Sequence, residues 1–232
     1  MTPYPPTTRL LLRANGEELN TIIIQMSIAL GILLAGIARY IVVERNSGLK
    51  HLQIISGMQL KAYWVGTFIF DFLKMYLTIL MAIILWAAFD LDLNAAMVPL
   101  ALLPFGALPF TYAFSFLFSS DAAASSITMF LHILILGILA SITWTFRIAI
   151  PPFMKYGDSM HSWFWLIPAY NVGAAMFCDR QCDVLSDVRK SPVAEGPETD
   201  ADKWAFPNIT RDCLVMILHL VVWSIVIMMI EK

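Results

Sequence analysis

Hydrophobic residues in this chain fall into long runs separated by short polar stretches. Five runs are long enough to cross a bilayer as α-helices, which takes ~20 apolar residues: 19–43, 62–89, 95–118, 122–146 and 213–230. A sixth run at 163–177 is shorter and contains Pro168, which favours a re-entrant or interfacial segment. The pattern therefore predicts an all-α membrane protein with five transmembrane helices and a short re-entrant or interfacial segment.

Five spans place the two ends of the chain on opposite sides of the membrane. One side would hold the loops after the first and third spans and the C-terminal end: 44–61, 119–121 and 231–232. Its short loops carry Arg45, Lys50 and Lys61, so the positive-inside rule makes this side cytoplasmic. Arg9 and Arg13 oppose that assignment. We predict an exocytoplasmic lead-in at 1–18 and a transmembrane domain at 19–232.

Composition and charge support the membrane class and exclude nucleic-acid binding. Of the 232 residues, 59% are hydrophobic and only 14% are charged, compared with ~25% charged residues in soluble domains. The formal net charge is -2 and the basic residues are scattered, so no basic patch for nucleic acid is expected. The sequence predicts an integral, multi-pass membrane protein without indicating which membrane holds it.

The polar stretch 178–207 is predicted to be an exocytoplasmic loop. Cys178 and Cys182 lie in it, and Cys213 and the sequon Asn208-Ile209-Thr210 follow it. Outside the cytosol, cysteines can form a disulfide and an Asn-x-Thr sequon can carry a glycan. A Cys178–Cys182 bridge and a bridge to Cys213 are both open, and Asn208 could also be too close to the membrane for modification.

Two ionisable side chains lie inside the second run. Asp71 and Lys74 are three residues apart and so share one face of a helix. Because a charged group within a span is unfavourable by ~2.5–3.5 kcal/mol, we expect the two to pair. The pair either neutralises itself and orients the helix, or marks a polar point on a translocation path. His132 is expected to face the bundle and bond to a neighbouring helix rather than bind a metal.

No catalytic or metal-binding motif is found in the sequence. No lysine follows a glycine, so a Walker A phosphate-binding loop is absent. His-Glu-x-x-His, Gly-x-Ser-x-Gly and a glycine-rich dinucleotide loop are absent as well. We therefore expect no catalytic residue, no metal and no cofactor in this chain itself.

The stretch VVERNSGLKHLQIISGMQLKAYW at 42–64 is charged, punctuated by glycines and lies between two spans. The order of its residues resembles that found in the transmembrane domain of the A subfamily of ATP-binding-cassette transporters, the lipid exporters. The matching positions are Glu44-Arg45, Lys50-His51-Leu52-Gln53, Ser56-Gly57, Tyr63-Trp64 and, in the next span, Asp71. The Lys-His-Leu-Gln form is most similar to the second membrane half of full-length members. The segments LPFGALPFTYAFSFLF and NITRDCLVMIL, with Pro3-Tyr4-Pro5, extend the resemblance over nearly the whole chain.

This resemblance implies a type V exporter-like half that lacks the first of six spans. It also implies a short re-entrant or exocytoplasmic helical hairpin between the last two spans, in which 163–177 would form one arm. It implies that 44–61 is a cytoplasmic coupling element that docks on a nucleotide-binding domain, in which Arg45, Lys50, His51 and Gln53 would be exposed. The coupling residues would be Glu44, Arg45, Lys50, His51, Gln53 and Gly57. A simpler role for Arg45 and Lys50 is to anchor the loop to anionic headgroups.

The same resemblance implies partners and cofactors outside this chain. ATP and Mg²⁺ would bind to nucleotide-binding domains, which would act with a second transmembrane half and with membrane lipids. The leading hypothesis is the membrane part of an ATP-driven phospholipid or sterol exporter, either as a fragment or as a subunit that assembles with its ATPase. An alternative is a membrane scaffold or regulatory subunit that retains the fold. A secondary carrier or channel around Asp71 is disfavoured by the single buried acid.

Overall fold

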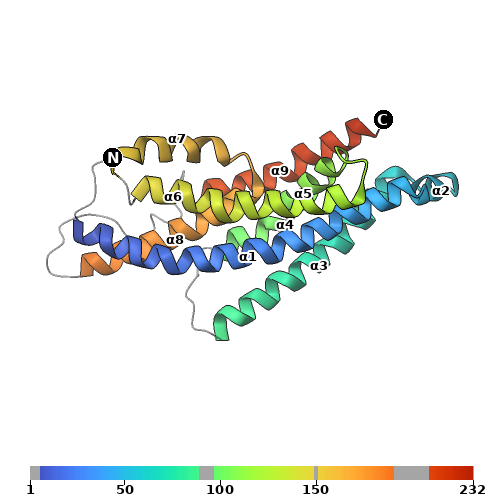
Figure 1. The fold of residues 1–232 in the computed structure, drawn as a ribbon. Coiled ribbons are helices and arrows are strands. Elements are labelled where there is room, and N and C mark those ends of the chain that lie inside the picture. Colours follow the sequence, from blue (N-terminus) through green and yellow to red (C-terminus); the bar gives the residue numbers. More distant parts are fainter. Residues whose placement is uncertain (1–5, 89–96, 149–150, 191–208, 232) are drawn as a thin grey trace.

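Helices make up the described part of the chain. The computed structural model describes residues 6–88, 97–148, 151–190 and 209–231, and no strand occurs within these ranges. The helices are α1 (Pro6–Asn46), α2 (Leu49–Ile55), α3 (Leu60–Ala88), α4 (Met97–Ser115), α5 (Asp121–His132), the π-helical η1 (Ile133–Leu139), α6 (Ala140–Ile148), the 3₁₀-helical η2 (Pro151–Phe153), α7 (Met154–Phe164), α8 (Pro168–Lys190) and α9 (Ile209–Ile230). The predicted all-α class is confirmed, and Figure 1 shows the long helices packed alongside one another.

Five segments are long and apolar enough to cross a membrane. They are Asn20–Asn46 in α1, Leu60–Ala88, Met97–Ser115, Asp121–Phe146 across α5, η1 and α6, and Ile209–Ile230. These bounds agree with the five predicted spans to within a few residues. The main difference is that α1 begins at Pro6, so the first helix continues back through most of the predicted lead-in at 1–18.

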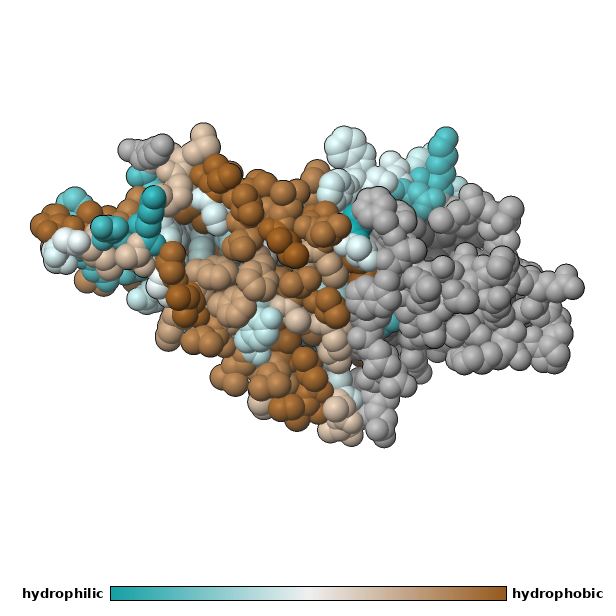
Figure 2. All heavy atoms as spheres, turned by 180° about the vertical axis from the view of Figure 1, so that it is seen from behind, coloured by the Kyte–Doolittle hydropathy of each residue, from teal (hydrophilic) through white to brown (hydrophobic). Residues whose placement is uncertain are grey.

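The spans differ in how much of their surface the bundle covers. In α4, 61% of the most apolar window is buried, whereas in α3 the share is 17%. Figure 1 shows α3 diverging from α1 as it runs away from α2. Figure 2 shows apolar side chains over the middle of one face and more hydrophilic ones at the end where α2 lies. A broad apolar surface next to a polar end is what the bilayer selects for, and the protein is an integral, multi-pass membrane protein.

Small residues bring the helices of the bundle into close contact at η1. A Cβ added at Gly137 would lie 2.6 Å from Oγ of Ser27 on α1. On the other side, a Cβ at Gly173 of α8 would lie 2.7 Å from Cβ of Ala140. Glycine therefore lets α1 and α8 approach the fourth span more closely than a larger residue would.

The predicted hairpin around 163–177 is formed by α7 and α8, which meet at a turn over residues 165–167. Every residue from 168 to 177 is buried, and α8 packs against α1, α4 and α9, so this arm lies inside the bundle. Residues 178–190 continue α8 as a helix, where a loop was predicted. No glycine or proline interrupts the chain before Pro192, so nothing in the sequence ends the helix earlier. The remainder of the predicted loop, 191–207, lies outside the described residues.

Alternating connections meet at opposite ends of the bundle. The helix α2, the α4–α5 connection and the C-terminal end of α9 lie together at one end, here called the α2 end (Figure 1). At the opposite end, α7 contacts the start of α9 through His161 and Arg211. This is the alternation that five consecutive spans predict.

Candidate functional site

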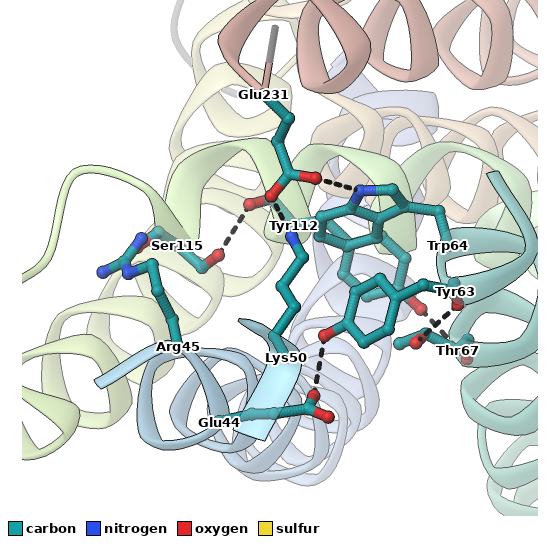
Figure 3. A network of polar contacts seen from close by, with 9 residues as sticks. All are labelled: Glu44, Arg45, Lys50, Tyr63, Trp64, Thr67, Tyr112, Ser115 and Glu231. Atoms are coloured by element: carbon teal, nitrogen blue, oxygen red, sulfur yellow. Dashed lines mark hydrogen bonds and ion pairs between the residues drawn. The ribbon is translucent and has the colours of Figure 1, made fainter. Parts of the chain in front are cut away.

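A network of charged and aromatic side chains joins five helices at the α2 end. We call it the end network; it consists of Glu44, Arg45, Lys50, Tyr63, Trp64, Tyr112, Ser115, Phe116, Phe118 and Glu231. Figure 3 shows most of these side chains, which come from α1, α2, α3 and α4 and converge with Glu231, the residue that follows α9. The network contains three of the six predicted coupling residues.

Glu231 is the point where α2, α3 and α9 are held together. One of its carboxylate oxygens pairs with the Lys50 ammonium, and the other accepts a 2.7 Å hydrogen bond from Nε1 of Trp64. The Lys50 and Glu231 side chains are only 13% and 10% exposed. Because both charges are largely withdrawn from water, each depends on the other for compensation.

Aromatic rings also lie around the Lys50 ammonium, and the indole of Trp64 bonds Glu231 as well. Nζ of Lys50 lies 4.7 Å from the ring centroid of Tyr63, 4.6 Å from that of Trp64 and 6.0 Å from that of Phe116. These distances are within the range of cation–π attraction. Lys50 is therefore held by one anion and three ring faces, and it fixes the orientation of α2 against the start of α3.

Glu44 attaches the end of α1 to the start of α3. Its side chain is buried, with 5% of the residue exposed, and Oε2 accepts a 2.7 Å hydrogen bond from the Tyr63 hydroxyl. The adjacent Trp64 packs on Tyr112 of α4 with a centroid distance of 5.4 Å. The Tyr63-Trp64 pair thus links α3 to both α1 and α4.

Arg45 attaches α1 to the connection between α4 and α5. Its guanidinium donates to the backbone carbonyls of Phe118 and, at 3.5 Å, of Ser115. It also lies 5.6 Å from the ring centroid of Phe116. Asn46 adds a 2.7 Å hydrogen bond to the Ser119 carbonyl. These contacts attach the end of α1 to carbonyls of the α4–α5 connection and to the Ser115 carbonyl, which also accepts from the Phe118 N–H.

The short helix α2 is set off from the spans by two glycines in the left-handed region. Gly48 has φ 74° and Gly57 has φ 101°, a conformation that other residues adopt at a free-energy cost. Between them, His51 and Gln53 are exposed, as are Leu52 at 62% and Ile55 at 68%. The outward surface of α2 is therefore mixed polar and apolar, whereas its Lys50 side is held by the network.

The structure corrects part of the predicted coupling surface. His51 and Gln53 are exposed as expected, but Arg45 and Lys50 turn inward to Phe118 and Glu231. Lys50 turns inward because the Glu231 carboxylate lies there, and Arg45 turns inward because backbone carbonyls accept from its guanidinium. Glu231 was not predicted as a site residue. A signal for it does exist, since it is the acidic residue that ends the last apolar run, at the same side of the membrane as Lys50.

The intramembrane pair is confirmed, with an additional partner. Nζ of Lys74 lies 2.5 Å from Oδ1 of Asp71, and the Tyr112 hydroxyl donates to Oδ2 at 2.8 Å. His132 is buried as expected, but Nδ1 bonds the Thr128 carbonyl of its own helix at 2.9 Å. Among the described residues His132 makes no hydrogen bond to a neighbouring helix, so that prediction was wrong.

Two of the predicted modification residues, Cys178 on α8 and Cys213 on α9, lie at the opposite end of the bundle. Cys178 and Cys213 pack around the same small cluster with Ala175 and Ile209, and Cys213 is a free thiol there. The Cys182 side chain and Asn208 lie outside the described residues, so the Cys178–Cys182 disulfide and the glycan stay predictions, whereas the alternative bridge to Cys213 is not formed in this structure. Nearby, Nη2 of Arg211 is 2.6 Å from Nε2 of His161. Within the described ranges, no three His, Cys, Asp or Glu side chains are grouped so that they could hold a metal ion.

The fold and the end network define a helical membrane domain with a short projecting helix at one end. Residues 15–229 match the family described as ABC-2 family transporter protein. Because the match covers nearly the whole chain, the protein belongs to this family of transporters.

Similar proteins extend the comparison to the A subfamily. The chain is 27% identical over 202 residues to "ABC transporter A family member 4" and 22% identical over 222 residues to "ABC transporter A family member 5", both of Dictyostelium discoideum. These matches cover 81% and 94% of this chain but 12% and 13% of those proteins. It is also 33% identical over 110 residues to human "ATP-binding cassette sub-family A member 13", covering 44% of this chain and 2% of that protein. The predicted resemblance is confirmed.

Proposed function

We propose that this chain is the membrane part of an ATP-driven pump that moves phospholipid or sterol between leaflets. ATP and Mg²⁺ would bind to nucleotide-binding domains outside residues 1–232, and a second transmembrane half would complete the assembly. Two observations support the proposal: the chain belongs to a transporter family, and the matched proteins carry the names of ATP-binding-cassette transporters. Apolar side chains exposed along α3 offer a surface compatible with lipid.

The observation that carries the coupling part of this proposal is the position of Glu231. The exposed side of α2, with His51, Gln53 and Leu52, would contact a nucleotide-binding domain. Movement of α2 would then act on Lys50 and, through Glu231 and Trp64, on α9 and α3 together. A rigid polar and aromatic connection transmits a displacement because its parts cannot slide independently.

The proposal is tested by replacing Glu231 with Gln in the natural ATP-hydrolysing assembly that contains this chain. Glu231→Gln removes the anion but keeps an oxygen that can accept from Trp64. We expect ATPase activity without added lipid to persist, while stimulation by lipid and the movement of fluorescent lipid fall several-fold. Lys155→Gln is the matched control, since Lys155 is an exposed cation on α7, outside the predicted coupling element 44–61.

Two results would contradict the proposal at different levels. If Glu231→Gln keeps full lipid stimulation, the end network does not couple. If the unaltered assembly neither moves lipid nor responds to it, lipid transport itself is wrong, and a scaffold or regulatory subunit that retains the fold becomes the better description.

A further inference from the structure

Four polar residues form a line along the otherwise apolar helix α3. They are Thr67, Asp71, Lys74 and Thr78, at positions i, i+4, i+7 and i+11. This spacing brings all four to one face of an α-helix. Beyond Trp64, the other residues of α3 with an oxygen or nitrogen in the side chain are Tyr76 and Trp86. We call the four residues the polar seam; Lys74 lies near the middle of the span.

The two charges of the polar seam are paired with each other but differ in their exposure. The Asp71 side chain is 4% exposed and accepts the hydrogen bond from Tyr112, so the anion faces the bundle. The Lys74 side chain is 39% exposed, and its ammonium lies 4.6 Å from the ring centroid of Phe70 on the outer surface. A cation in the middle of a span is therefore open to whatever lies beside the protein, although its counter-ion is not.

The residues beside the polar seam are those of a lipid-facing surface. Phe70, Leu73 and Leu77 are 64%, 62% and 62% exposed, and α3 is the least buried of the five spans. On the other side of the seam, Met75 and Ile79 are buried against the bundle. The polar seam thus runs along the boundary between the packed face and the apolar outer face of α3.

We propose that Lys74 binds the phosphate group of a membrane glycerophospholipid part-way across the bilayer, with the acyl chains against the outer face of α3. The chemistry of Lys74 indicates the occupant, because an exposed ammonium with N–H donors to spare binds an anionic oxygen. In an apolar medium the available anion is the phosphodiester of a lipid, since a sterol or a neutral glycolipid has none. This inference rests on the proposed function, in which the protein moves lipid across the membrane: the lipid would be a glycerophospholipid, and Lys74 would bind it.

A purely structural role for the pair makes a different prediction about Asp71. If the pair only neutralises itself, removing either charge harms the protein in the same direction. If Lys74 binds phosphate, Asp71 competes with the lipid for the ammonium. Asp71→Asn then strengthens phospholipid binding, whereas Lys74→Gln weakens it. The asparagine can still accept from Tyr112, so the packing of α3 on α4 is kept.

The experiment measures binding of a photoreactive phosphatidylserine to the whole ATP-hydrolysing assembly in galactolipid vesicles, which contain no phosphate. We expect Lys74→Gln to weaken labelling of α3 about tenfold, equivalent to ~1.4 kcal/mol. Lys74→Arg should retain it, and Asp71→Asn should bind several-fold more tightly. Lys61→Gln is the control for loss of a cation on the same helix. Soluble glycerophosphorylcholine should not compete, because it cannot place its phosphate at mid-span.

The possible outcomes distinguish failure of the Lys74 site from failure of the proposed transport function. The site is overturned if the unaltered, Lys74→Gln and Asp71→Asn proteins are labelled equally. It is also overturned if Lys74→Gln, Asp71→Asn and Lys74→Arg all lose labelling. Competition by glycerophosphorylcholine would make it a site for soluble phosphate. If labelling follows the predicted order but lipid neither moves nor stimulates ATP hydrolysis, the site stands and the proposed function fails.

Discussion

Replacing Glu231 by Gln and Lys50 by Gln, singly and together, measures how strongly α9 is held to α2. The single change at Glu231 leaves the Lys50 ammonium, 13% exposed, without its anion. The single change at Lys50 leaves the Glu231 carboxylate with the Trp64 indole as its remaining hydrogen-bond donor among the described residues. The double change removes both charges, so neither is left uncompensated.

The expected magnitudes follow from burial and from the contacts that survive. Breaking a buried ion pair by removing one partner destabilises a protein by ~3–5 kcal/mol. Three aromatic rings still face Lys50 after Glu231→Gln, and each such contact contributes ~0.5–2 kcal/mol. We therefore expect ~3 kcal/mol for each single change, at the low end of the range. The double change should cost ~4 kcal/mol, which gives a coupling energy of ~2 kcal/mol.

The assay is reversible unfolding of the detergent-solubilised protein, with the free energy of unfolding measured for all four proteins of the cycle. A matched cycle on Lys61 and Glu231 should give no coupling, because Lys61 is exposed at the start of α3. A coupling energy below ~0.5 kcal/mol between Lys50 and Glu231 would be that of an ordinary surface ion pair. It would refute the view that Glu231 locks the three helices together.

Two further predictions concern packing and orientation. Gly137→Ala should destabilise the bundle by ~2 kcal/mol or more, because its Cβ would meet Oγ of Ser27 at 2.6 Å. Adding Ser27→Ala should recover part of this loss, as measured by thermal unfolding. An unchanged melting temperature of the Gly137→Ala protein would contradict the close contact. A cysteine replacing the exposed Ser56 on the α2 end should react with an impermeant maleimide only from the cytoplasmic side. Labelling from the outside would reverse the assigned orientation.

The positions of the spans could be predicted because hydrophobic run length is a local property of the sequence. The bilayer requires ~20 apolar residues per helix, and the runs satisfy this requirement without knowledge of their neighbours. The pairing of Asp71 with Lys74 was likewise predictable, since both residues lie on one helix. Local patterns thus determined the fold class and the intramembrane pair.

Contacts between distant segments could not be predicted in this way. Lys50 and Glu231 are 181 positions apart, and only the folded bundle brings them together. A charged residue in a loop is by default expected to face water, so Lys50 and Arg45 were predicted as exposed. The helix over 178–190 was missed for another reason: polar residues suggest a loop when the buried first half of α8 is not known.

The π-helical turn η1 has a consequence for the phase of the fourth span. A turn closed by i→i+5 hydrogen bonds takes up one residue more than an α-helical turn, and one residue corresponds to about 100° of rotation. On one side of η1, α5 packs on α1; on the other, α6 packs on α7 and α8. One continuous span therefore presents two faces that point in different directions, and the length of η1 sets the angle between them. Substitutions in α5 and α6 are consequently constrained by different neighbours, although both helices belong to one membrane span.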